Sequence, residues 1–135
     1  MDRDLFEAAR TVRLRAHAPY SHFLVGAALR TEDGKVYAGA NVENASYPEG
    51  WCAEPSAIAH MIAASTSAGG RRIAAMTCVA DPIGGRPTTP CGGCRQRIAE
   101  FAGPDTRVHC LSPGGVGRTW LLSELLPGAF SMDAR

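Results

Sequence analysis

Residues 90–96 read PCGGCRQ, a run in which Cys91 and Cys94 form a C-x-x-C motif. Alone, this motif is compatible with a redox pair, with half of a zinc site or with chance. A second run, CAE at residues 52–54, adds a third thiol on Cys52 and a carboxylate on Glu54. The two runs together favour a metal site over the other interpretations, because thiolates are the ligands that zinc prefers.

Both groups of cysteines stand where we expect helices to begin. Residues 52–67 are rich in alanine and contain apolar residues at helical spacing, and Pro55 falls in the first turn, where its missing N–H is tolerated. Residues 92–101 predict another helix. A helix N-terminus favours the thiolate form of cysteine, which is the form that binds a metal. Two such helices packed side by side would bring three thiolates to one point.

Three ligands indicate a catalytic rather than a structural zinc site, because structural sites use four protein ligands. The candidates for a fourth ligand lack ligand spacing: His60 lies eight residues into its helix, about 12 Å along the axis, and His109 precedes Cys110 on an expected strand. An open position on zinc activates water, and Glu54 would move the protons as general acid and base. Cys78 and Cys110 have apolar neighbours and are interpreted as buried packing residues.

The rest of the chain predicts an α/β fold, with a mixed sheet covered by helices. An apolar stripe predicts a helix over residues 2–17, which Pro19 ends. A Gly-containing turn between two apolar runs predicts a β-hairpin over residues 23–29 and 36–42. The remaining expected elements are strands over 73–80 and 107–111, loops over 84–90 and 112–117, and a last helix over 120–126.

Composition narrows the class of protein. A chain of 135 residues, 45% hydrophobic and 20% charged, predicts a single globular domain over residues 1–135. The formal net charge of +1 and the lack of a Lys/Arg run argue against a nucleic-acid polymer as partner. The charged start of the sequence predicts no signal peptide, and no stretch is long enough to cross a membrane. We therefore expect a cytoplasmic protein, in which five cysteines serve metal binding or catalysis rather than disulfides.

Four runs, in this order, resemble those of the small homotetrameric cytidine deaminases: FLVGAA at 23–28, NVENASY at 41–47, the CAE and PCGGCRQ pair, and ELLPGAF at 124–130. The resemblance covers nearly the whole chain and implies a mixed sheet sandwiched by helices in three layers. It also implies zinc-dependent hydrolytic deamination of cytidine and 2′-deoxycytidine to uridine and 2′-deoxyuridine with release of ammonia, a reaction of pyrimidine salvage.

The same resemblance assigns roles to individual residues. One Zn²⁺ per chain would be held by Cys52, Cys91 and Cys94, with Glu54 as the catalytic residue. The implied substrate contacts are Phe23 as a wall of the base pocket, Asn41 and Glu43 on the sugar hydroxyls, the backbone N–H of Ala53 on the 2-oxo group, Tyr47 at a subunit boundary, and Phe130 reaching the base in a neighbouring subunit.

The chain departs from the family at residues 48–51, which read PEGW, and at Pro55, where the family usually has an arginine that hydrogen-bonds the zinc thiolates. Three thiolates on Zn²⁺ leave a net charge of −1, which weakens its effect on water unless a donor offsets it. Arg95 and the two helix N-termini are the compensation that the sequence offers. Trp51 would either reshape the pocket or anchor the loop.

These departures leave alternatives open. Within the same chemistry, the substrate would be a modified or bulkier aminopyrimidine nucleoside, such as an aminonucleoside antibiotic, selected by the loop at 48–51. From another class, the protein would be a zinc-stabilised nucleoside-binding module that has lost catalysis through Pro55. A thiol redox protein acting through Cys91 and Cys94 is a third alternative.

Overall fold

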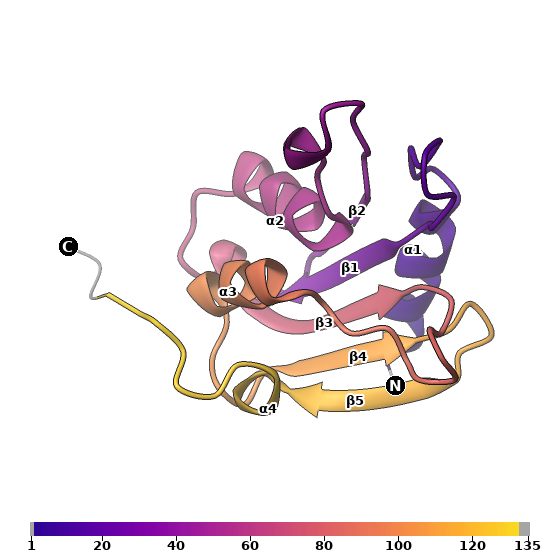
Figure 1. Cartoon of the computed structure of the whole chain (residues 1–135). Helices are drawn as coiled ribbons and strands as arrows, with labels where there is room; N and C mark the ends of the chain where they lie inside the picture. The colour runs from indigo at the N-terminus through magenta and orange to yellow at the C-terminus, as the bar shows by residue number, and fades with distance from the viewer. Residues whose placement is uncertain (1, 133–135) are drawn as a thin grey trace.

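The computed structural model describes residues 2–132, which form a five-stranded sheet with helices on both faces (Figure 1). The strands are β1 (Gly26–Thr31), β2 (Val36–Ala40), β3 (Ile73–Val79), β4 (Arg107–Leu111) and β5 (Gly117–Leu121). The helices are α1 (Arg3–Arg13), α2 (Ala53–Ala64), α3 (Gly92–Phe101) and α4 (Leu122–Leu125), with short 3-10 turns η1 (Tyr47–Glu49) and η2 (Gly69–Arg71). Within the described residues, no helix is both long and apolar enough to span a bilayer.

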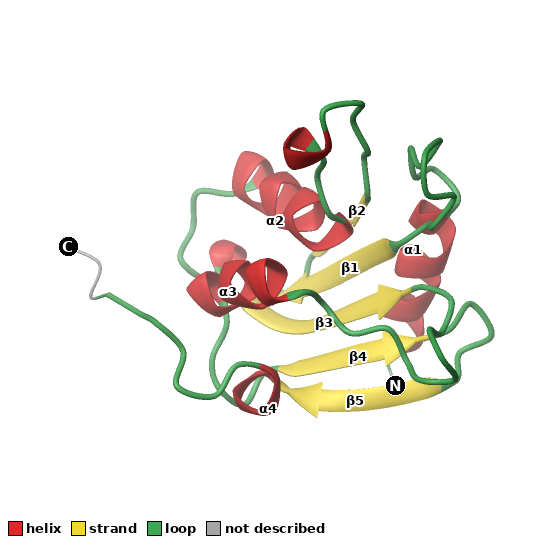
Figure 2. Ribbon diagram, viewed as in Figure 1, coloured by secondary structure: helices red, strands yellow, loops and turns green. Residues whose placement is uncertain are grey.

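The sheet is mixed, with strand order β2-β1-β3-β4-β5 (Figure 2). β3 and β4 pair in parallel, and the other three pairs are antiparallel. A parallel pair needs a crossover connection, and α3 supplies it between β3 and β4. The first turn of α3, which carries the C-x-x-C motif, therefore follows the loop that leaves the carboxyl end of β3.

Each face of the sheet has its own apolar core. On one face, Leu5 and Ala9 of α1 pack with Ala28 and Val79. On the other face lies a larger core in which Met61 of α2 and Ile98 of α3 belong to one cluster with alternate strand residues, among them Leu29, Met76, Cys78, Val108 and Cys110. Successive side chains of a strand point to opposite faces, so one sheet separates the two cores. The expectation of a mixed sheet between helices in three layers is confirmed.

The first helix is shorter than its apolar stripe predicts. It ends at Arg13 rather than at residue 17, because the following segment pairs with another part of the chain. The backbone N–H of His17 donates to the carbonyl oxygen of Asn41 at 3.0 Å, and the N–H of Glu43 donates to the carbonyl of His17 at 2.7 Å. These hydrogen bonds join the end of the α1 segment to residues 41–43.

The prediction of a helix over residues 120–126 is wrong for its first part. Trp120 and Leu121 belong to β5, which pairs antiparallel with β4, and only Leu122–Leu125 is helical. Trp120 lies opposite Val108, and Thr119 lies opposite His109. Aromatic and β-branched residues suit a strand, and β5 also covers the edge that β4 would otherwise expose.

The central elements agree closely with their sequence predictions. The helix over 92–101 and the strand over 107–111 have the expected bounds, and β3 ends one residue early, at Val79. The hairpin is present but shorter, with β1 beginning at Gly26. The helix predicted over 52–67 spans Ala53–Ala64, with Cys52 as its N-cap.

Gly39 lets α2 lie unusually close to β2. A methyl group at Gly39 would overlap the backbone nitrogen of Ala57 and lie 2.6 Å from Cβ of Ser56. Cβ atoms essentially never lie so close to other heavy atoms, so α2 would have to move away from the sheet.

We predict that Gly39→Ala lowers the free energy of unfolding by about 2 kcal/mol, as expected for overpacking against a rigid backbone. Urea denaturation monitored by circular dichroism measures this free energy of unfolding. Gly103→Ala is the matched control, since its methyl group would meet only Thr106 Oγ1, at an ordinary 4.0 Å. Equal stabilities for the two variants would contradict this account of the packing of α2 on β2.

Candidate functional site

Two of the three clustered cysteines are N-caps of helices. Cys52 precedes α2 with φ −77° and ψ 164°, and Cys91 precedes α3 with φ −67° and ψ 168°. Neither side chain makes a capping hydrogen bond, so both thiols are left for another use. Cys94 lies in the first turn of α3 and is buried. The Sγ atoms of all three lie within 4.8 Å of one another.

This cluster fits a zinc ion. Ligands about 2.3 Å from a tetrahedral zinc lie about 3.8 Å from each other, which is compatible with three Sγ atoms that all lie within 4.8 Å of one another. Among residues 2–132, they form the only group of three or more Cys, His, Asp or Glu side chains with this proximity. His60 contacts the Tyr37 ring, and His109 hydrogen-bonds Thr119 Oγ1 at 2.7 Å. Neither histidine belongs to the cluster, in agreement with their lack of ligand spacing in the sequence.

The cysteines differ in how readily they lose a proton. The hydrogen bond with Cys94 is the main cause that lowers the pKa of Cys52, to about 6, against the opposing effect of burial. The same hydrogen bond, together with burial, raises the pKa of Cys94 far above its ordinary value. A thiolate therefore forms readily at the start of α2, and a metal ion would have to displace the proton that Cys94 keeps.

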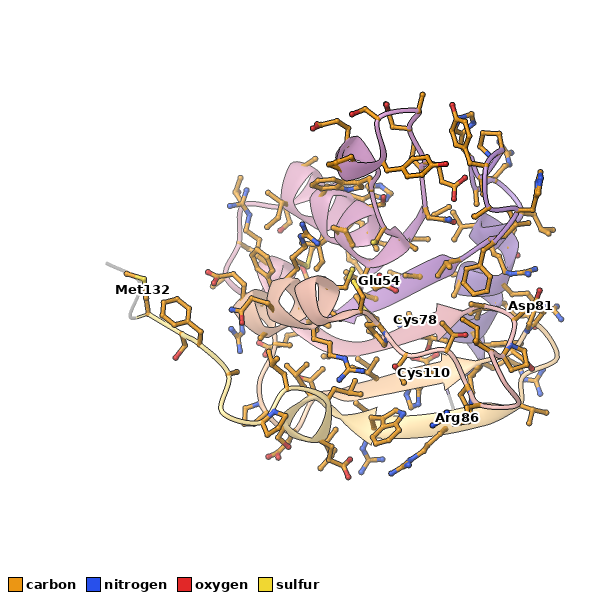
Figure 3. The ribbon with its side chains drawn as sticks, in the orientation of Figure 1. Glu54, Cys78, Asp81, Arg86, Cys110 and Met132 are labelled. Carbon is orange, nitrogen blue, oxygen red and sulfur yellow. The ribbon has the colours of Figure 1, made fainter. Side chains whose placement is uncertain are left out.

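Glu54 lies in the first turn of α2 and is only 5% exposed. Figure 3 shows it above Cys78 of β3, with Cys110 of β4 beyond. Burial, reinforced by the Glu54 charge, raises the pKa of Cys78 and raises that of Cys110 to about 12. Both thiols stay protonated and pack in the core, as expected from the sequence. The carboxylate is thus held between the three clustered cysteines and an apolar sheet.

A cavity of about 330 Å³ adjoins the cluster. Cys52, Cys91 and Glu54 line it together with four of the expected substrate contacts, namely Phe23, Asn41, Glu43 and Ala53. Ser21, Thr88 and Thr89 also line the cavity, although no sequence motif predicted them as site residues. Thr88 and Thr89 immediately precede the PCGGCRQ run, so their position in the sequence was a usable signal. Nothing in the sequence marks Ser21.

Asn41 and Glu43 use much of their hydrogen-bonding capacity on the chain itself. Asn41 Oδ1 accepts from the N–H of Val25, and its Nδ2 donates to the carbonyl of Phe23, each at 2.9 Å. Glu43 accepts from the N–H groups of Tyr20 and Ser21 and from the Ser21 hydroxyl, which lowers its pKa. These bonds hold two loops as cavity walls. One amide hydrogen and several lone pairs remain for a ligand.

Tyr47 and Phe130 lie outside this cavity. Tyr47 lines a neighbouring cavity of about 450 Å³ with Tyr20 and Trp51, and it is 75% exposed. Phe130 lies in the tail that follows α4, is 70% exposed and lines neither cavity. The carbonyl of Phe130 accepts a hydrogen bond from the Gln96 side chain of α3.

The guanidinium of Arg95 does not bind the clustered thiols. Its Nε donates to the carbonyl of Pro90 at 2.7 Å, its Nη1 to the carbonyl of Leu125 at 2.7 Å, and its Nη2 to Thr89 Oγ1 at 3.0 Å. Arg95 thereby fastens the segment leading to Cys91 and ties it to α4. The sequence suggested that Arg95 offsets the charge of the thiolates, but its hydrogen bonds go to oxygen atoms instead.

Known proteins resemble this chain in sequence. Residues 1–111 match the family model of the "Cytidine and deoxycytidylate deaminase zinc-binding region". A cytidine deaminase of Halalkalibacterium halodurans is 45% identical over 98% of this chain and 97% of its own. One from Mycobacterium tuberculosis is 40% identical over 87% of this chain and 80% of its own.

Solved structures agree with these sequence matches. The crystal structure of cytidine deaminase from Burkholderia pseudomallei superimposes with a TM-score of 0.86 at 43% identity, covering 96% of this chain and 99% of that one. Cytidine deaminase from Mycobacterium tuberculosis gives a TM-score of 0.80 at 34% identity, covering 98% and 99% of the two chains. Likeness of this extent, in sequence and in fold, shows that the chain belongs to the cytidine and deoxycytidylate deaminase family of zinc-binding proteins.

Proposed function

We propose that the protein hydrolyses the exocyclic amine of cytidine and 2′-deoxycytidine, consuming one water and releasing uridine or 2′-deoxyuridine and ammonia. The observation that carries this proposal is the buried Glu54 carboxylate beside three clustered thiols at the wall of the 330 Å³ cavity. The relatives named cytidine deaminase support the choice of substrate. The activity is that of a hydrolase.

Cys52, Cys91 and Cys94 would hold one zinc ion per chain, leaving its fourth position open. When bound, zinc supplies Lewis-acid activation of a water molecule. Glu54 would accept the proton of that water on its carboxylate and deliver it to the pyrimidine, so that the C4–N bond breaks and the amine leaves as ammonia. The apolar surroundings of Glu54 favour this role, because they keep bulk water from competing for the proton.

The cavity walls suit a nucleoside. The N–H of Ala53, the first residue of α2, has no partner within its helix and would donate to the 2-oxo group of the base. Phe23 offers an aromatic wall for the ring, and Asn41 and Glu43 offer a donor and acceptors for sugar hydroxyls. The family resemblance suggests each of these roles, and all four residues line the cavity, which supports them.

The charge of the cavity favours a nucleoside over its monophosphate. Its lining residues include two carboxylates, on Glu43 and Glu54, and contain no Lys or Arg. A 5′-phosphate would therefore enter a site of like charge with no cation to offset its desolvation.

We further propose that the chain is one deaminase domain over residues 1–135 that assembles as a homotetramer. Tyr47 and Trp51 are exposed aromatic side chains that line the 450 Å³ cavity, and Phe130 is exposed on the tail that follows α4, where it is free to reach another chain. These exposed side chains support completion of each site by a neighbour. All five cysteines are free thiols, a state that suits a reducing cytoplasm. The reaction would return pyrimidine nucleosides to salvage.

Glu54→Gln should lower kcat for cytidine by about 10² to 10⁴-fold, the usual contribution of a general acid–base group. The loss of ultraviolet absorbance as cytidine becomes uridine measures the rate. Zinc content and nucleoside affinity should change little, because the amide keeps the shape of the carboxylate. Equal rates for variant and parent would remove Glu54 from the mechanism, and no turnover by the zinc-loaded parent would overturn the proposed activity.

Deoxycytidine should be deaminated with a kcat/KM at least about 100-fold higher than deoxycytidylate, given the cost of placing a phosphate beside two carboxylates. Ammonia release from the two substrates at equal concentration measures the ratio. A preference for deoxycytidylate would contradict the inference drawn from the charge of the cavity.

Phe130→Ala should raise KM about tenfold while zinc content is unchanged, because the lost aromatic surface would lie against the base. If Phe130 serves a neighbour, co-expression of Phe130→Ala chains with Glu54→Gln chains should give mixed tetramers whose kcat/KM per chain, measured at cytidine concentrations below KM, exceeds that of either variant alone. Such sites combine Glu54 of one chain with Phe130 of another. A monomer in sedimentation, or no gain on mixing, would refute the shared site.

A further inference from the structure

The proposed zinc site carries an excess of negative charge. Three thiolates and the Glu54 carboxylate against one dication leave two net negative charges, close to buried side chains. Uncompensated charge near an apolar core is costly, so a cation nearby would strengthen metal binding. α2 offers none in its first turn, where Glu54 is followed by the buried Pro55.

Arg97 is the cation that the fold brings to both ligand-bearing segments. Its Cζ lies 5.6 Å from the centroid of the Trp51 ring, and Trp51 directly precedes Cys52. Its Nη1 lies 3.4 Å from the position that a Cβ on Gly93 would take, and Gly93 lies between Cys91 and Cys94. The guanidinium therefore sits beside the start of α3 and against the residue that leads into α2.

The other contacts of Arg97 leave its charge available. Among the described residues, no carboxylate lies within salt-bridge distance of it, whereas Arg10, Arg13, Arg30 and Arg72 are all paired. Arg95, its neighbour on α3, uses three nitrogens on Pro90, Thr89 and Leu125.

We propose that Arg97 is a positioning residue that stabilises the metal-loaded site by balancing the charge of its thiolates, with Trp51 holding the guanidinium in place. This inference rests on the proposed zinc site. Cation–π contact with a tryptophan directs the guanidinium without neutralising it. Because Arg97 is exposed, water and salt screen its charge, and the expected effect on zinc affinity is about tenfold.

Zinc affinity, measured by competition with a chelator on the full-length protein, tests the proposal. Arg97→Gln should bind zinc about tenfold more weakly than the parent at low salt, and the difference should shrink in 1 M salt as screening increases. Arg97→Lys should retain most of the affinity, since it keeps the charge. Arg3→Gln is the matched control, because Arg3 is an exposed arginine on α1, across the sheet from the site.

The outcomes separate this inference from the proposed function. A parent protein that holds no zinc would overturn the metal site itself. A parent that holds one zinc per chain, with Arg97→Gln of equal affinity, would leave the deaminase intact and refute the role of Arg97. An Arg97→Lys variant as weak as Arg97→Gln would also refute charge balance, since the positive charge would then have no effect.

Discussion

The site depends on the meeting of two helix N-termini that both begin at a cysteine. Cys52 and Cys91 are N-caps without capping hydrogen bonds, and Cys94 turns back toward them from the first turn of α3. The separation of the thiols follows from how α2 and α3 pack on one face of the sheet. The absence of a side chain at Gly39, and the crossover of α3 between parallel strands, are what bring these helix starts together.

Loops around the metal site are held by polar side chains bonded to backbone. Asn41 joins the segment before β1 to the end of β2, Glu43 binds the loop at residues 20–21, and Arg95 fastens the approach to Cys91. Each satisfies backbone groups that no strand or helix pairs. Asn41 and Glu43 also line the cavity, so the side chains that we propose as substrate contacts are the ones that hold its walls.

The charge of the cavity supports the proposal that the site takes a neutral substrate. The cavity lining contains carboxylates and thiols without a cation, while the nearby arginines are either bonded to backbone, as Arg95 is, or stacked on an aromatic ring, as Arg97 is. We propose that Arg97, which does not line the cavity, balances the charge of the metal site without attracting a phosphate into the cavity. The formal net charge of +1 is consistent with a protein that does not attract phosphates.

Local spacing and composition were enough to predict the three clustered cysteines, the buried Glu54, the two helix starts and the central strands. The sequence also identified four of the residues that line the cavity, through family resemblance. Long-range contacts of the folded chain fix three features that the sequence did not predict: α1 ends at Arg13, Trp120 belongs to β5, and Arg95 binds oxygens rather than sulfurs. Those outcomes depend on partners distant in the chain, such as Asn41, Val108 and Leu125, whose pairing no local pattern records.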